Sequence, residues 1–353
     1  MVAFPVISAG AAPAVPAAPA ATESGVAGGT MFGGTYPLVS EQGKLGRKLA
    51  IVRIYYMIGQ KFTTPHIKQL MSAGTTVLAS LDVPHSHGIS YASIAAGRQD
   101  KQILAWLTQA EQDAVTYHVP AVYVAFEHEA NATANRVLGT PAQFVAAWRH
   151  IHALAAKAHL NWNTGGRLHW AMILMHMAYF PKSDRPKWSF RLGFASDYYP
   201  GAGNVDVIAA DGYDRGGCRT VHGHTVPTEA SVSPGSLFDP VLSFASAHGG
   251  LPVFLAEWAG AYYSGKPGFQ TKFINAMKSY VLGNPRIAAV MYWDQHGNMS
   301  CQFSISKDAP SVRALTAMGK VLNGHLAGPR AGARTRPMVH HSPPAAGEAQ
   351  LPW

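Results

Sequence analysis

Residues 121–131, with the sequence AVYVAFEHEAN, decide the fold, because an unbroken apolar run ends there in a cluster of polar side chains. Such a run, without polar alternation, is typical of a parallel strand that is buried on both faces of a sheet. Comparable runs lie outward from it in both directions. They are residues 30–33, 50–56, 76–81, 168–175, 205–210, 253–256 and 288–293. Together with residues 121–126 they predict eight strands.

Helix signals follow these runs. Thr64–Pro65 and Thr140–Pro141 each place a capping hydroxyl before a proline at the first helical position, and we expect Asp239–Pro240 to open a further helix. Eight strand–helix units over about 290 residues are what a single (β/α)8 barrel, or TIM barrel, requires. An open doubly wound sheet is the alternative, but no glycine-rich phosphate loop follows the first strand. The sequence therefore predicts an α/β protein with one barrel.

The two ends of the chain differ from this middle part. Residues 1–29 are rich in alanine and proline and contain no basic residue, so we expect a signal-peptide remnant or a linker before the barrel domain of residues 30–325. Residues 326–353 are rich in proline, alanine and arginine and lack periodicity, which is typical of a flexible tail. Low cysteine usage together with the N-terminal composition favours a secreted protein.

The overall charge points to no particular partner. The net charge is +9, from 28 basic and 19 acidic residues, but no dense run of Lys and Arg occurs, so we do not expect nucleic-acid binding. No apolar stretch reaches the roughly 18 residues of a membrane span. We expect a monomer that does not associate with a membrane.

In a barrel of this kind the reacting groups lie at the carboxyl ends of the strands and in the loops after them. Glu129 follows the predicted fourth strand and Glu257 follows the seventh, and these strands lie nearly opposite one another across the barrel. A carboxyl pair about 5–5.5 Å apart is typical of a retaining glycosidase, whose two groups need different pKa values. The alternative for either glutamate is a surface carboxylate or an ion-pair partner of Arg53.

Other side chains suited to sugar binding follow the same strand ends. Sugars offer apolar C–H faces and many hydroxyls, so their sites combine aromatic rings with hydrogen-bonding groups. The residues that we expect to bind substrate on this ground are Arg53, Tyr55, His85, Asp211, Tyr213, Trp258 and Trp293. Core packing is the alternative for each aromatic residue.

Four motifs give the chain a resemblance to a known family. They are His128-Glu129-Ala130-Asn131, the run Asp197-Tyr198-Tyr199-Pro200-Gly201 followed by Val205-Asp206 and Asp211-Gly212-Tyr213, then Phe254-Leu255-Ala256-Glu257-Trp258, and Tyr292-Trp293-Asp294. Over roughly residues 31–323 the sequence resembles glycoside hydrolase family 26, within the clan (clan A) of retaining barrel glycosidases. The resemblance implies Glu129 as acid/base, Glu257 as nucleophile, His128 as a contact of the reacting sugar, Tyr213 as hydrogen-bond partner of the nucleophile and Trp293 as the aromatic floor beneath the sugar.

One departure from the family leaves the substrate open. Many members carry Arg-Pro two residues before the His-Glu pair, where this chain has Ala125-Phe126-Glu127. The resemblance implies an endo-acting hydrolase of a β-linked polysaccharide. β-Mannan is the expected substrate, and mixed-linkage β-glucan and β-1,3-xylan are the alternatives within the family. A non-catalytic carbohydrate-binding barrel is the alternative from another class.

The sequence also contains histidine and aspartate residues that could bind a metal, and two cysteines. The set His85-x-His87, His169, His176, Asp211 and Asp294 could belong to a metal-dependent hydrolase, but such enzymes usually carry the His-x-His pair on the first strand, so we expect no metal and no cofactor. Cys218 and Cys301 follow the sixth and eighth strands, where a disulfide between two loops and two free thiols are both open.

Overall fold

The computed structural model describes residues 26–27, 29–40, 42–86, 88–184, 193–295, 301–322 and 324–326. The predicted leader or linker, apart from its last few positions, lies outside the described residues. The predicted tail beyond residue 326 and His87 of the weighed metal set also lie outside them.

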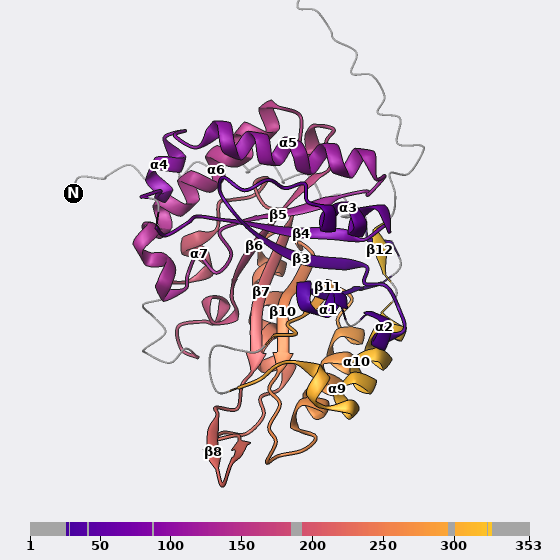
Figure 1. The fold of residues 1–353 in the computed structure, drawn as a ribbon. Helices are drawn as coiled ribbons and strands as arrows, with labels where there is room; N and C mark the ends of the chain where they lie inside the picture. Colours follow the sequence, from indigo (N-terminus) through magenta and orange to yellow (C-terminus); the bar gives the residue numbers. More distant parts are fainter. Residues whose placement is uncertain are drawn as a thin grey trace, which may run out of the picture.

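Eight parallel strands close into a barrel, which confirms the predicted fold (Figure 1). Their order around the barrel is β10-β11-β2-β3-β4-β5-β6-β7. The strands are β2 (Met31–Thr35), β3 (Ile51–Met57), β4 (Thr76–Asp82), β5 (Val122–Phe126), β6 (Leu168–Met175), β7 (Val207–Asp214), β10 (Val253–Gly260) and β11 (Ile287–Tyr292). Strands β7 and β10 each run four residues further than their apolar runs, so the polar residues at their ends belong to the sheet.

Helices surround the strands, with α5 and α6 covering one side and α9 and α10 covering another (Figure 1). The helices are α1 (Tyr36–Ser40), α2 (Gln42–Leu45), α3 (Pro65–Ser72), α4 (Tyr91–Ala95), α5 (Asp100–Thr116), α6 (Pro141–Lys157), α7 (Ala195–Tyr198), α8 (Pro234–Ala247), α9 (Phe269–Leu282) and α10 (Ala309–Val321). Short 3₁₀ turns lie at η1 (Thr133–Leu138), η2 (Trp162–Thr164), η3 (His176–Tyr179) and η5 (Ile305–Lys307).

The helix starts follow the expected capping chemistry, with one exception. The hydroxyls of Thr64 and Thr140 accept the backbone N–H groups of the third helical residues of α3 and α6. The predicted start at Asp239–Pro240 is wrong, because Ser233 caps α8 six residues before Asp239. Pro240 lies inside α8, where a proline cannot donate a backbone hydrogen bond.

Two shorter pairings complete the sheet structure. The antiparallel hairpin of β8 (Arg219–Val221) and β9 (His224–Val226) projects from the barrel in the loop that follows β7 (Figure 1). The short strands β1 (Val26–Ala27) and β12 (His325–Leu326) pair with one another. No helix of the described part of the chain is both long and apolar enough to span a bilayer.

The core has two layers. Side chains from all eight strands fill the barrel interior, among them Ile51, Tyr123 and Phe254. The alternate side chains point outward and pack against the helices, as Tyr56 does against Trp106 of α5. Because neighbouring residues of a strand face opposite sides, this division determines which polar side chains reach the mouth of the barrel.

Candidate active site

Glu257 is held by three side chains at the carboxyl end of β10. The Nη1 atom of Arg53 lies 2.9 Å from its Oε1 atom, and the Tyr55 hydroxyl donates a hydrogen bond to the same oxygen at 2.5 Å. The Tyr213 hydroxyl donates to its Oε2 atom. Burial raises the pKa of both phenols well above the usual value, so both remain O–H donors at neutral pH. Glu257 is therefore an oriented carboxyl group.

Arg53 carries the positive charge of this half of the site. It lies on β3 with no exposed surface, and its Nη1 atom is also 2.7 Å from Oδ1 of Asp211 on β7. Burial alone would lower the pKa of Arg53, but the charges of Asp211 and Glu257 outweigh it and hold that pKa well above its usual value. Burial raises the pKa of Asp211, and the charge of Arg53 opposes that rise. One guanidinium thus serves two buried carboxyl groups.

Glu129 faces this group from the turn that follows β5. Its side chain is half-buried, and burial raises its pKa, with the negative charge of Glu257 as the next largest cause. The positive charges of His128, Arg53 and Arg215 act in the opposite direction. The two glutamates that the sequence singled out therefore interact electrostatically in one site. A carboxyl group with a raised pKa is suited to act as a general acid at neutral pH.

Glu127, two residues earlier, occupies a different environment. It is buried, and its Oε2 atom accepts the backbone N–H of Val83 at 2.6 Å. Burial and the charge of Asp82 raise the pKa of Glu127 to about 8. Its main charged neighbour is thus Asp82, whereas that of Glu129 is Glu257. The sequence prediction left out this carboxyl, although a glutamate directly after a buried run was a signal for it.

His128 lies between these two glutamates and is fixed by Asp82 at the end of β4. Its Nδ1 atom is 2.9 Å from Oδ1 of Asp82, and its ring centroid lies 5.2 Å from that of Tyr55. Burial would lower the pKa of His128, but the charge and hydrogen bond of Asp82 raise it to about 9. His128 is therefore an imidazolium at neutral pH, placed beside the ring that contacts Glu257. Asp82 is a second residue that the sequence prediction missed.

A cleft of about 950 Å³ opens beside this group, between the loops that follow β3, β4 and β5. His128, Glu129 and His85 line it. The Nε2 atom of His85 lies 3.0 Å from Oδ1 of Asn135, so His85 contacts a protein side chain at the rim. A space of this size is in the range of small-ligand sites.

The two tryptophans that were expected to bind substrate differ in position. Trp293 follows β11, is partly exposed, and meets the ring of Tyr55 edge-on at 6.1 Å between centroids. Trp258 has no exposed surface and packs against Tyr292 and against Phe273 of α9. The prediction that Trp258 binds substrate is wrong, because its indole points away from the barrel axis into the layer between strands and helices.

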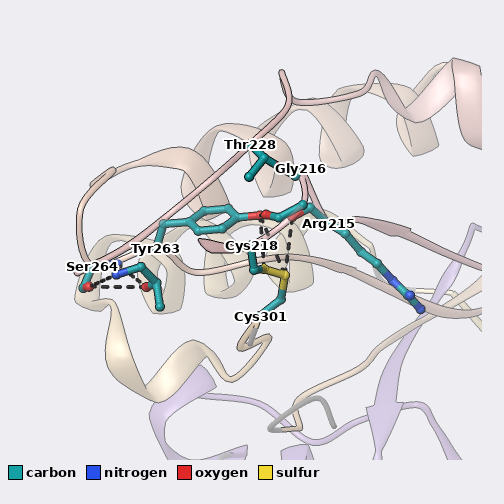
Figure 2. Close-up of a disulfide and its surroundings, with 9 residues drawn as sticks. Arg215, Gly216, Cys218, Thr228, Tyr263, Ser264 and Cys301 are labelled. Carbon is teal, nitrogen blue, oxygen red and sulfur yellow. Dashed lines mark hydrogen bonds between the residues drawn. A yellow bond between two sulfur atoms is a disulfide. The ribbon is translucent and has the colours of Figure 1, made fainter. Parts of the chain in front are cut away.

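Cys218 and Cys301 form a disulfide, which decides between the two alternatives that the sequence left open (Figure 2). Their Cα atoms are 5.6 Å apart, and the bond joins the loop after β7 to the segment after β11. The Tyr263 hydroxyl donates to the backbone oxygen of Gly217 beside it at 2.5 Å. In the same loop, the guanidinium of Arg215 lies 5.3 Å from the ring centroid of Tyr213. The disulfide thus braces the loop that begins after Asp214 at the end of β7.

The residues weighed as metal ligands do not gather in one place. His169 lies near the start of β6 and stacks on Trp162, whereas His176 follows the other end of that strand, with Nδ1 3.1 Å from the backbone oxygen of Asp211. Burial lowers the pKa of both imidazoles to about 4. Within the described ranges no cluster of three His, Cys, Asp or Glu side chains is arranged to hold a metal ion.

No family model matches the sequence, and no curated protein matches it. Solved structures do resemble the fold. A family 26 β-mannanase from Bacteroides ovatus aligns over 83% of this chain and 89% of its own, with 12% identity and a TM-score of 0.54. Fungal β-1,4-galactanases align over 82% and 99%, with 13% identity and a TM-score of 0.52. An exo-β-1,4-mannosidase from Opitutaceae bacterium strain TAV5 aligns over 85% and 61%, with 13% identity and a TM-score of 0.53.

These similarities show the fold. The chain has the (β/α)8 barrel that the three glycoside hydrolases share. Sequence identities of 12–13% show a common fold and do not show a common family or substrate.

Proposed function

We propose that this chain is a retaining β-glycoside hydrolase that cleaves a β-linked polysaccharide from within, with β-mannan as its substrate. The observation that carries the proposal is that Glu257, which Arg53, Tyr55 and Tyr213 orient, lies close enough to Glu129 for its charge to raise the pKa of Glu129. One carboxyl is held for attack and the other has a raised pKa. Double displacement requires this division of roles between two carboxyl groups.

In the first step Glu129 donates its proton to the glycosidic oxygen, while a carboxylate oxygen of Glu257 attacks the anomeric carbon. The leaving sugar departs with that proton, and a glycosyl ester forms on Glu257. Ester formation removes the negative charge of Glu257, which is the largest charge raising the pKa of Glu129. The pKa of Glu129 then falls, so its carboxylate can take a proton from the water that hydrolyses the ester.

The surrounding residues have defined parts in this sequence. Arg53 and Tyr213 hold the carboxyl group of Glu257 that attacks the anomeric carbon. The imidazolium of His128 and the ring of Trp293 both lie against the ring of Tyr55, whose hydroxyl donates to Glu257. In the proposed reaction they contact the hydroxyls and the apolar face of the reacting sugar. We further propose that the protein is a secreted monomer with no nucleic-acid or membrane partner; the disulfide supports the secreted location, since such bonds persist in oxidising compartments.

The test compares three glutamine variants on one panel of polysaccharides. We expect Glu129→Gln and Glu257→Gln to lose at least about a hundredfold in kcat, the scale of an acid/base or nucleophile contribution. Glu127→Gln is the matched control from the same turn and should retain most of the activity. The panel contains β-mannan, mixed-linkage β-glucan and β-1,3-xylan, and product size separates internal from terminal cleavage.

The outcomes separate the alternatives. Proton NMR of the first product formed should show the β-anomer if configuration is retained. Full activity in Glu129→Gln or Glu257→Gln would refute the assignment of both roles. Binding to a polysaccharide by the wild-type protein, without release of reducing ends from any of the three, would favour a carbohydrate-binding barrel.

A further inference from the structure

The turn that carries Glu129 has an unusual backbone. Glu127 and Glu129 adopt φ values of 49° and 50°, in the left-handed region that residues with a side chain seldom occupy. His128 lies between them. Such a conformation persists only when the surrounding contacts hold it, and it is common at functional sites. The position of Glu129 therefore depends on the groups that hold this turn.

Two side chains from neighbouring segments hold the turn from opposite ends. Asp82 accepts the backbone N–H of His128 at 3.2 Å, through the same Oδ1 atom that binds the imidazole. Asn135 of η1 donates from Nδ2 to the backbone oxygens of both His128, at 3.3 Å, and Glu129, at 3.0 Å. Asn135 thus links the backbone carbonyl groups of His128 and Glu129.

His85 fixes the orientation of that amide. Its Nε2 atom lies 3.0 Å from Oδ1 of Asn135, and a ring N–H there requires the amide oxygen to face His85. The NH₂ group must then face the two carbonyl oxygens. His85 was expected to contact substrate. In the structure it contacts the side-chain amide of Asn135, which supports Glu129.

We propose that Asn135 is a positioning residue for the acid/base Glu129, an inference that rests on the proposed function. Asn135 acts through the backbone of the turn and takes no part in proton transfer itself. A general acid must lie within hydrogen-bond reach of the leaving oxygen, and a displacement of about 1 Å can cost a large factor in rate. Loss of Asn135 should therefore weaken the proton-transfer steps selectively.

The test uses the leaving group to separate acid catalysis from folding. The substrate is a dinitrophenyl β-glycoside of the sugar that the polysaccharide panel identifies. Its dinitrophenolate group leaves without protonation, whereas the leaving oxygen of a natural glycosidic bond needs the acid. In Asn135→Ala we expect kcat/KM for the polysaccharide to fall about 10- to 100-fold, a partial loss of the acid contribution. For the dinitrophenyl glycoside kcat/KM should change less than about threefold, and added azide should raise its turnover by replacing water as the second nucleophile.

Asn284→Ala is the matched control, because Asn284 also donates from Nδ2 to a backbone oxygen, that of Tyr280 on α9 at 2.7 Å, away from the site. The control should lower the melting temperature about as much as Asn135→Ala while leaving both kcat/KM values unchanged. Asn135→Leu is the second variant, since it keeps the approximate size of the side chain and removes the N–H donors without adding a charge. It should reproduce the selective loss if Asn135→Ala fails to fold.

Each result decides the matter. Equal losses on both substrates, or wild-type activity in both Asn135 variants, would overturn the inference while the proposed function stands. Wild-type activity of Glu129→Gln on the polysaccharide would instead overturn the proposed function.

Discussion

Glu127 gives a sharp prediction about stability, because its carboxyl group is buried and the opposing charge of His128 is outweighed by burial and by the charge of Asp82. Burial and the charge of Asp82 raise its pKa from 4.5 to about 8. Since a displacement of one pKa unit corresponds to about 1.4 kcal/mol, ionisation of Glu127 in the folded protein costs at most about 5 kcal/mol. That cost is a large fraction of the unfolding free energy of an ordinary domain, which is about 5–15 kcal/mol.

Because folding raises the pKa of Glu127, its effect on the free energy of unfolding decreases as the pH rises. Between pH 4.5 and about 8 the folded state keeps a proton on Glu127 that the unfolded chain has already released. The contribution of Glu127 to the free energy of unfolding is therefore fully present below pH 4.5, is lost as the pH rises towards 8, and changes no further above it. A glutamine at this position has no proton to lose, and its amide oxygen can still accept the N–H of Val83.

We expect Glu127→Gln to match the wild type within about 1 kcal/mol near pH 4.5 and to exceed it by up to about 5 kcal/mol near pH 8. Urea unfolding at a series of pH values measures this difference directly. Glu229→Gln is the control, because Glu229 is exposed in the loop after β9 and its replacement should give a difference that stays flat with pH. A flat difference for Glu127→Gln as well would refute the conclusion that Glu127 is buried as a neutral acid.

Three further predictions follow from the contacts around the site. Tyr213→Phe removes a hydrogen bond to the proposed nucleophile and should lower kcat about 10- to 100-fold with KM nearly constant in steady-state assays; an unchanged kcat would exclude that role. Replacing Cys218 and Cys301 with serine opens a link across 83 positions and should destabilise the fold by about 2–5 kcal/mol in urea unfolding, whereas an equal midpoint would contradict the bond. Trp258→Ala should cost about 3–5 kcal/mol of stability, and Trp293→Ala should raise KM while leaving the unfolding midpoint nearly unchanged; the reverse pattern would contradict their placement.

The barrel could be predicted from sequence because a parallel strand that is buried on both faces appears as a continuous run of apolar residues. Each of the eight apolar runs became a strand, and the strand that begins the barrel, Met31–Thr35, was found despite its two glycines. The strand ends could not be predicted in the same way. Asp211 and Tyr213 are polar or partly polar, so the pattern stops before them, but β7 continues to Asp214 because its backbone groups pair with β10 up to that residue.

The site was predictable where simple alternation holds. On β3 the inward positions begin with Ile51 in the barrel interior, and Arg53 and Tyr55 follow at steps of two. Both therefore point towards the mouth of the barrel, where they reach Glu257. Position along the strand and the period of two were sufficient to place these two side chains, but substrate binding stays a prediction for Tyr55, and the full burial of Arg53 makes it an ion-pair partner of Glu257 instead.

Alternation fails on β10, and this failure determines where the side chain of Glu257 points. Phe254 and Ala256 face the barrel interior, so strict alternation would turn Glu257 outward and Trp258 inward. The pairing with β7 shifts between Leu255 and Glu257, where two steps on β10 oppose one step on β7, as in a β-bulge. The extra residue reverses the faces that follow, so that Glu257 reaches Arg53 and Trp258 packs against α9. The apolar pattern of Val253–Ala256 contains no sign of this bulge, so the sequence could not show that only one of Glu257 and Trp258 faces the mouth of the barrel, and both were expected in the site.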